Sequence, residues 1–311
     1  MRGARAMPAR RLEVPPELAG ERADKALAAL AGVSRSLARR LLEEGAATAD
    51  GGPLSPRRAV SAGQVLTVEL PASAAALAPE DVPFTVRYED AHLAVVDKPA
   101  GIVVHPGAGR RQGTLAGGIL PRWPLVRGVG EEGRWGIVHR LDRDTSGLLV
   151  VALTAEAWTG LRRAIAGHLV ERTYLALVHG DPSAATGTID APLGRHPRRR
   201  GLVQVEAAGR GARTHYRCVA RWPSARRSLL EVTLETGRTH QIRVHLAAIG
   251  HPVVGDPVYG RGDPLVARQF LHATRLRFAH PITGEPVEVE SPLPPDLAEP
   301  LSRLGEPAPE T

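Results

Sequence analysis

The sequence predicts an α+β fold with a mixed, largely antiparallel sheet, arranged as one large domain preceded by a small one. Three observations predict this class. Runs with strand-like alternation are numerous, helical patterns are few, and no G-x-x-x-x-G-K-[ST] loop occurs. A G-x-G-x-x-G match occurs at 128–133, but no expected strand leads into it and no expected helix follows it, so nucleotide and dinucleotide cofactors have no visible site. At 311 residues the chain exceeds the usual size of a single domain.

Composition indicates a globular protein with an aliphatic core. Hydrophobic residues make up 43% of the chain and aromatic residues only 4%. No run approaches the roughly 18 apolar residues of a membrane helix. The first eleven residues are basic and no apolar segment follows them, so we expect no secretory signal and a cytoplasmic protein. The single cysteine, Cys218, excludes an internal disulfide and is expected to be a small core residue rather than a nucleophile.

The charge balance favours an anionic polymer as partner. The net charge is +7 and the basic residues are nearly all arginine, since only Lys25 and Lys98 are lysines. Arginine binds phosphate through a planar fork and stacks on bases. Biased codon usage could explain arginine in place of lysine, but it would not explain the net charge.

Residues 11–71 are predicted to form a separate module of two short helices and a small sheet. Asp50-Gly51 marks a hairpin turn, and alternation in 65–70 marks a strand. Ser34 is a predicted helix cap, and on that helix Arg35, Arg39 and Arg40 lie off the apolar stripe. The order of elements resembles the alpha-L RNA-binding module, which implies that these arginines contact RNA. As a solvated helix face they would need no function.

After a proline-bounded linker at 72–80, the second domain is expected at 81–300, followed by a flexible tail at 301–311. Alternating runs predict its strands at 84–88, 93–96, 172–178, 214–222, 229–235, 270–278 and 287–290. Thr154 is predicted to cap one helix. Thr239 is predicted to cap another, with Ile242, Leu246 and Ile249 on its apolar face.

The densest stretch of charge lies between two apolar segments at 136–151. Ile137-Val138 and Leu148 to Val151 are predicted strand ends, and the turn between them carries two carboxylates and several cations. Such a turn on rigid strands suggests a functional site. The alternative is a solvated loop whose arginines and aspartates pair with each other.

Two further stretches carry candidate site residues. Arg243 shares a helix side with His240 beside the buried stripe, so it should point partly inward and need an anion, for which Asp142 is the candidate. Arg198, Arg199 and Arg200 form a basic loop that could clamp phosphate or be a solvated turn. Lys98 and His105 lie at turns rich in Pro and Gly and are expected to be polar edges of these turns rather than ligands.

Together these motifs resemble the RluA-type pseudouridine synthases. The resemblance runs from about Leu12 to Pro294 and is strongest for the branch acting on large-subunit ribosomal RNA. The motifs that carry it are Asp97-Lys98-Pro99-Ala100-Gly101, His139 to Gly147, Tyr174, Gly237 to Arg243, and Gly255-Asp256. It implies the pseudouridine synthase fold and an isomerase that breaks the bond from ribose to the base nitrogen, turns the base and forms a carbon–carbon bond. It implies no metal or organic cofactor; we further expect a monomer without membrane contact.

The resemblance also implies residue roles. Asp142, not Asp144, is the catalytic aspartate; it would either attack the anomeric carbon or remove a proton from the neighbouring ribose carbon. Arg243 would keep it charged and oriented. Tyr174 would stack on the flipped base, and Arg140 would enter the RNA helix where the base has left. The family often has lysine two positions before the tyrosine, where this chain has Arg172.

Two rival functions remain open from the sequence. A non-catalytic RNA-binding or ribosome-assembly protein would keep the basic module and use Asp142 only as a structural partner of Arg243. A metal-dependent hydrolase would use His and Asp side chains as ligands, and the candidates are His139, Asp142, Asp144, His245 and Asp256. Against the second, nearby arginines would repel a divalent cation.

Overall fold

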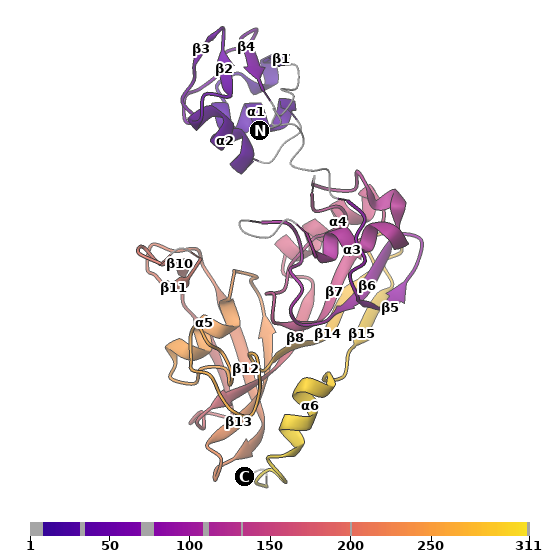
Figure 1. Ribbon diagram of the computed structural model, residues 1–311, viewed down its shortest axis with the longest axis vertical. Helices are drawn as coiled ribbons and strands as arrows, with labels where there is room; N and C mark the ends of the chain where they lie inside the picture. The colour runs from indigo at the N-terminus through magenta and orange to yellow at the C-terminus, as the bar shows by residue number, and fades with distance from the viewer. Residues whose placement is uncertain are drawn as a thin grey trace, which may run out of the picture. The chain divides into compact units, whose positions relative to one another are not determined.

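The computed structural model describes residues 9–31, 35–69, 78–107, 112–131, 133–199 and 201–309. The chain divides into two compact units, shown in Figure 1. Apart from residues 131–135, which group with the first unit, one unit ends at Ala78 and the other begins at Pro79, so the main division falls within the expected linker. Most of that linker lies outside the described residues. None of the helices in the described ranges is long and apolar enough to cross a membrane.

The first unit is a small sheet covered by two helices. Its described elements are β1 (Arg10–Glu13), η1 (Pro16–Leu18), α1 (Ala23–Ala31), α2 (Arg35–Glu43), β2 (Ala47–Ala49), β3 (Gly52–Pro53) and β4 (Val65–Val68). The strands pair in the order β1-β4-β2-β3. Leu27, Leu66 and Val68 are fully buried between the layers. Asp50 and Gly51 have φ of 49° and 80°, the positive values that a two-residue hairpin turn requires, which confirms the predicted turn. Ser34 and Leu70 lie outside the described residues.

The second unit is built on one large sheet. Its described strands are β5 (Thr85–Glu89), β6 (Leu93–Lys98), β7 (Ser146–Ala152), β8 (Glu171–His179), β9 (Thr186–Asp190), β12 (Arg213–Trp222), β13 (Arg227–Leu234), β14 (Leu271–Ala279) and β15 (Pro286–Glu290). The order is β5-β6-β7-β14-β8-β13-β12-β9, with β15 also paired to β14. Within the described ranges β7 and β14 are the one parallel pair of this sheet. The predicted α+β class with a mixed, mostly antiparallel sheet is confirmed.

The parallel pair brings distant parts of the chain together. All of β7 is buried, and Gly147 lies opposite Ala273 of β14. A Cβ on Gly147 would lie 2.2 Å from the Ala273 carbonyl oxygen, and its φ is +112°, so only glycine fits. On its other side Ala273 pairs with Tyr174 of β8. The sheet therefore sets the charged turn that precedes β7 near Tyr174.

The helices of the second unit are α3 (Leu115–Arg122), η2 (Pro124–Val126), α4 (Ala155–Ala166), α5 (Gln241–Ala248) and α6 (Pro295–Ser302). In Figure 1, α3 and α4 lie by β5 to β7, and α5 lies by β12 with the hairpin of β10 (Leu193–Arg195) and β11 (Val203–Val205). Thr154 caps α4 as predicted, since its hydroxyl accepts a hydrogen bond of 3.2 Å from the Ala157 N–H. Helices α3 and α6 were not predicted.

Several local expectations were wrong. Ile137 and Val138 form no strand, and only an isolated bridge joins Ile137 to Val151. The cap of α5 is His240, in the left-handed region with φ 56°, and not Thr239. Cys218 is half-buried at a bulge of β12 rather than in the core.

The C-terminal stretch is more ordered than a flexible tail. Helix α6 occupies part of the proline-rich segment. Beyond it, Trp222 Nε1 donates to the Gly305 carbonyl at 2.9 Å, and the Ala308 N–H donates to the Arg221 carbonyl at 2.8 Å. These bonds tie the chain to β12 as far as Ala308.

Candidate active site

The turn before β7 is held rigidly through its backbone. The carbonyls of Asp142, Arg143 and Asp144 each accept a hydrogen bond. The donors are the N–H of Thr145 at 3.2 Å, the N–H of Gly101 at 2.9 Å and Nη1 of Arg268 at 3.0 Å. Because three successive peptide groups are fixed in this way, the Asp142 side chain projects from a preorganised loop.

Lys98 fastens the same loop from inside the protein. Its side chain is fully buried, and Nζ donates to the carbonyls of Pro99, Ile102 and Arg143 at 2.9, 3.0 and 3.1 Å. Burial lowers the pKa of Lys98 to about 7. The expectation of a polar turn edge was therefore wrong for Lys98, which joins the end of β6 to the loop that carries Asp142.

Asp142 contacts Arg243, as predicted. Arg243 Nη1 donates to Asp142 Oδ2 at 3.1 Å, and the two side chains are 6% and 15% exposed. Arg243 also binds Asp256 through two parallel bonds, Nε to Oδ2 at 2.7 Å and Nη2 to Oδ1 at 2.9 Å. Asp256 is fully buried and holds two nitrogens of the guanidinium in place, which leaves Nη1 directed at Asp142.

Charge pairing dominates the titration of this cluster. Burial alone would lower the pKa of Arg243, but the hydrogen bonds and charge of Asp256, together with Asp142, raise that pKa above its ordinary value. Burial would raise the pKa of Asp256, but Arg243 lowers it overall. Arginine and Asp256 therefore remain an ion pair at neutral pH.

Asp256 anchors Arg243, a contact that the sequence did not predict. Its Oδ1 accepts the N–H groups of Val258 and Tyr259 at 2.8 and 3.1 Å. The preceding Gly255 has φ +75°, and a Cβ there would lie 2.3 Å from the Arg268 carbonyl oxygen. The sequence does contain a signal for this contact. A glycine followed by aspartate and proline indicates a turn with a fixed backbone, which can hold the aspartate side chain in one position.

Tyr174 forms an apolar floor close to the cluster. It is 5% exposed on β8, and burial raises the pKa of its phenol, opposed by the charge of Arg172 and supported by that of Asp142. Two residues earlier, Arg172 is also buried and its Nη2 donates to the carbonyls of Leu234 and Glu235 at 3.4 and 3.2 Å. Arg172 therefore fastens β8 to the end of β13.

The other charges of the turn face outward. Arg143 pairs with Asp144 at 2.8 Å, and their side chains are 60% and 30% exposed. The picture of a solvated loop with internal pairs thus holds for these two residues but not for Asp142. Arg140 is exposed and has no hydrogen bond or ion pair through its side chain within the described ranges.

The remaining predicted RNA contacts are surface arginines. Arg198 and Arg199 are exposed, and their N–H groups both donate to His196 Nδ1 at 3.2 Å, which shapes the turn between β10 and β11. Arg200 lies outside the described residues. On the first unit Arg35, Arg39 and Arg40 are more than half exposed and pair with Asp24, Glu43 and Glu44 respectively. The pairs of Arg39 and Arg40 are exposed on both sides and therefore weak, so a phosphate can replace their carboxylates, whereas the Asp24 partner of Arg35 is buried.

The residues proposed for a metal hydrolase do not gather. In the part of the chain that the structure describes, no three His, Cys, Asp or Glu side chains are placed to hold a metal ion. His139 Nε2 accepts the Val150 N–H at 3.1 Å, and His245 bonds to Thr214 and to the Ala191 carbonyl at 2.8 and 2.9 Å. Both imidazoles are therefore already hydrogen-bonded to other groups of the protein.

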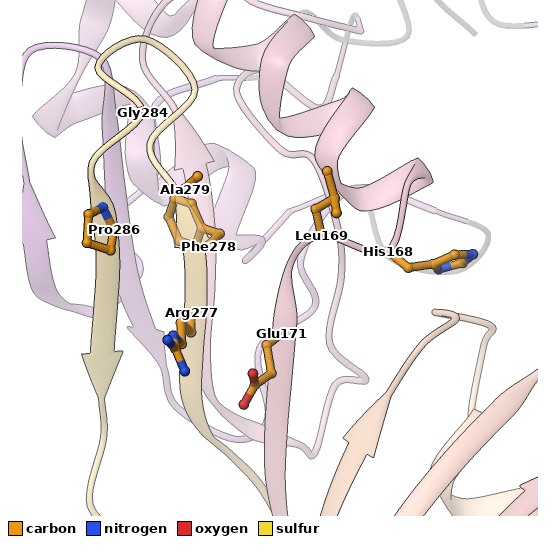
Figure 2. A pocket seen from close by; sticks show the side chains of 8 residues that line it. All are labelled: His168, Leu169, Glu171, Arg277, Phe278, Ala279, Gly284 and Pro286. Carbon is orange, nitrogen blue, oxygen red and sulfur yellow. The ribbon is translucent and has the colours of Figure 1, made fainter.

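A surface groove lies elsewhere on the second unit. Figure 2 shows the side chains that line it, between the end of α4, the start of β8, β14 and the turn into β15. The volume of the groove is about 360 Å³. Its lining includes Glu171, Arg277 and the exposed Leu169, but none of Asp142, Tyr174 and Arg243. The groove is therefore separate from the candidate active site.

Comparison with known proteins agrees with this site. Residues 92–248 match the RNA pseudouridylate synthase family. The chain is 44% identical to ribosomal large subunit pseudouridine synthase D of Xanthomonas campestris, over 96% of this chain and 93% of that protein. For the protein of the same name from Pseudomonas aeruginosa the identity is 45%, over 95% of each chain. The solved structure of human RNA pseudouridylate synthase domain containing 1 superposes with a TM-score of 0.58 and 30% identity, over 74% of this chain and 90% of that one.

The chain belongs to the RNA pseudouridylate synthase family. It is an isomerase that converts uridine in RNA to pseudouridine. The resemblance to RluA-type enzymes found in the sequence is thereby confirmed.

Proposed function

We propose that this enzyme isomerises uridines of large-subunit ribosomal RNA in the cytoplasm, as a monomer, with Asp142 as its catalytic carboxylate. The substrate assignment rests on the two relatives above, whose names specify the ribosomal large subunit. One observation carries the catalytic assignment: Asp142, on a loop with a fixed backbone, is held at 3.1 Å by an arginine that a buried aspartate anchors.

The reaction exchanges one bond of the ribose for another. The bond between the anomeric carbon and N1 of uracil breaks, the base turns, and the anomeric carbon bonds to C5. The proton on C5 leaves and N1 ends protonated, so the product is an isomer of the substrate. An ionised carboxylate can begin this by attacking the anomeric carbon or by removing the proton of the neighbouring ribose carbon.

The surroundings of Asp142 suit both routes. Arg243 stabilises the carboxylate anion and fixes its direction, because Asp256 prevents the guanidinium from turning away. Tyr174 offers an apolar ring on which the extruded base can stack, and burial keeps its phenol protonated. The exposed Arg140, next but one to Asp142, can fill the place that the base leaves in the RNA.

Arginines away from the turn supply affinity for the phosphate backbone. We assign this role to Arg198 and Arg199 of the β10–β11 hairpin, with Arg200 in the same basic run. Residues 11–71 act as an alpha-L RNA-binding module, through Arg35, Arg39 and Arg40 on α2. Contacts of this kind position RNA without reading its sequence.

The test replaces Asp142 by Asn and by Ala. Both variants should form no pseudouridine while RNA affinity stays within about tenfold of wild type, because phosphate contacts supply most of the binding. Asp144→Asn is the matched control, since this neighbouring carboxylate pairs with Arg143 at the surface and should be dispensable. Product formation by either Asp142 variant at the wild-type rate would refute the assignment. Mapping pseudouridine in ribosomal RNA from cells with and without the gene identifies the target uridines.

A further inference from the structure

A series of polar contacts runs from the β10–β11 hairpin to the second oxygen of Asp142: two hydrogen bonds followed by one longer contact. The Val203 N–H of β11 donates to the Tyr259 hydroxyl at 3.0 Å. That hydroxyl lies 2.8 Å from Nδ1 of His240, and Nε2 of the same ring lies 3.9 Å from Asp142 Oδ1. Arg243 holds Oδ2, so the two carboxylate oxygens face two different groups.

The hydrogen bonds of Tyr259 favour one of the two neutral tautomers of His240. The Tyr259 hydroxyl already accepts a hydrogen bond from Val203, and its own proton is then free to be donated to Nδ1 of His240. An imidazole that accepts at Nδ1 and is neutral carries its proton on Nε2. That proton faces the carboxylate of Asp142.

We propose that His240 is a positioning residue, a neutral imidazole whose Nε2–H orients Asp142 and whose tautomer is set by Tyr259. This inference rests on the catalytic role proposed above for Asp142. At 3.9 Å the contact is longer than a hydrogen bond, and catalytic contacts of this kind shorten when substrate closes the site.

The backbone and the packing support this role. His240 has φ 56°, a left-handed conformation that a non-glycine residue adopts at a cost and that marks functional sites. Its ring packs edge-to-face on Tyr259, with centroids 5.5 Å apart, and the Arg243 guanidinium lies 5.1 Å from the same Tyr259 ring. One tyrosine thus touches both groups that face Asp142.

His240 is held in the neutral form. Burial is the largest influence and lowers the pKa of His240, opposed by the charge of Asp142 and reinforced by that of Arg243. A proton added at Nδ1 would also displace the donor of Tyr259. The ring therefore acts as a fixed dipole and not as a titrating base.

The same series of contacts joins the hairpin that carries the proposed RNA-binding arginines to the proposed catalytic carboxylate of Asp142. Val203 lies on the strand that follows the turn carrying Arg198 and Arg199. Val203 and Tyr259 pack on one small cluster formed by Leu193, Ala212 and Val244. The hairpin and the tyrosine that orients His240 therefore share one packing cluster.

The first experiment reads the tautomer directly. Nitrogen chemical shifts of ¹⁵N-histidine protein, with the His240 signals assigned by their loss in His240→Asn, should show protonated Nε2 and unprotonated Nδ1. In Tyr259→Phe the same signals should move towards a mixture of tautomers. A proton on Nδ1 in the wild-type protein would overturn the proposal. This readout does not depend on activity, so it stands apart from the test of Asp142.

The second experiment measures rates. Tyr259→Phe keeps the ring but loses the hydroxyl. We expect kcat to fall about 5- to 10-fold, which corresponds to the loss of one hydrogen bond, and KM to stay within about twofold of wild type. His240→Asn tolerates the left-handed backbone but is too short to reach Asp142, and kcat should fall at least as far. Tyr88→Phe is the matched control, because it also loses one hydroxyl bond, at 2.7 Å to Asp90, on β5. A wild-type kcat in both site variants would overturn the proposal, whereas activity in Asp142→Asn would overturn the proposed catalytic role.

Discussion

Replacement of Arg243 by methionine should damage stability and activity by separate routes. Methionine matches the length of the apolar part of the side chain but leaves Asp256 as a fully buried carboxylate with only the N–H groups of Val258 and Tyr259 as partners. Removing one member of a buried pair typically costs about 3–5 kcal/mol. Asp142 loses its cation in the same variant, so product formation should fall roughly 100-fold or more.

A second substitution distinguishes the two effects. In Arg243→Met with Asp256→Asn the buried charge is gone, and the Asn carbonyl can still accept the two N–H groups. We expect recovery of about 2–3 kcal/mol of the lost stability and no recovery of activity. Arg217→Met is the matched control, because the Arg217–Glu231 pair lies at the surface with Arg217 57% exposed, and its loss should cost under about 1 kcal/mol.

The assays are urea unfolding followed by circular dichroism and single-turnover formation of pseudouridine on a ribosomal RNA fragment. If the double variant regained activity together with stability, Arg243 would be merely a structural partner of Asp256, and the reasoning would be refuted. An unchanged unfolding free energy in Arg243→Met would equally contradict the burial of this pair.

The same pair predicts the response to acid. The pKa of Asp256 is lowered overall in the folded protein, because Arg243 outweighs the effect of burial. Its stabilising contribution is therefore complete above the unfolded pKa of about 3.9 and is lost as pH falls through the lower folded value. Below about pH 4 the unfolding free energy of wild type should drop more steeply than that of the double variant, as measured by urea titrations at each pH.

Three further outcomes follow from the geometry. Lys98→Met leaves three buried carbonyls without their donor and should cost on the order of 3 kcal/mol in urea unfolding. Gly147→Ala meets backbone at 2.2 Å and should lower the thermal midpoint by more than 5 °C, whereas Gly211→Ala, with open space around it, should change it little. Arg198→Ala with Arg199→Ala should reduce the slope of log affinity against log salt by about 1.5 to 2, and an unchanged slope would exclude phosphate contacts there.

Local signals in the sequence predicted local structure well. Thr154 precedes an amphipathic segment and caps α4, and Asp50-Gly51 forms the hairpin turn, because each depends on neighbours within a few residues. Leu66 and Val68 alternate with polar residues and are buried on one side of β4. At these positions the conformation is determined by residues nearby in the sequence and depends little on tertiary contacts.

Elements that depend on packing were missed. Helix α3 contains Gly117, Gly118 and Pro121, which disfavour a helix, yet the glycines let it approach neighbouring chain so closely that a Cβ on Gly118 would lie 2.7 Å from Val82 Cβ. Helix α6 likewise contains Pro300. In both helices tertiary contacts outweigh a low intrinsic helix propensity, and the hydrophobic periodicity of the sequence does not reveal either helix.

The site was predictable in its principal pair and not in its supports. Arg243 beside a buried stripe needs an anion, and that requirement indicated Asp142 although the two lie far apart in the chain. Periodicity tells which side chains point inward but not how many partners they meet there. The bonds of Lys98 to the loop, of Asp256 to Arg243 and of Tyr259 to His240 all arise from the sheet order.

The place of β14 between β7 and β8 has a consequence for synthesis of the protein. During translation β7 and β8 emerge early, but the strand that joins them comes more than ninety residues after β8 ends. Until it inserts, Gly147 lacks its partner Ala273 and Tyr174 lies on a strand not yet aligned with the Asp142 turn. A nascent chain can therefore present the basic helix α2 well before it can modify a base, because the catalytic sheet is complete only when most of the polypeptide has been synthesised.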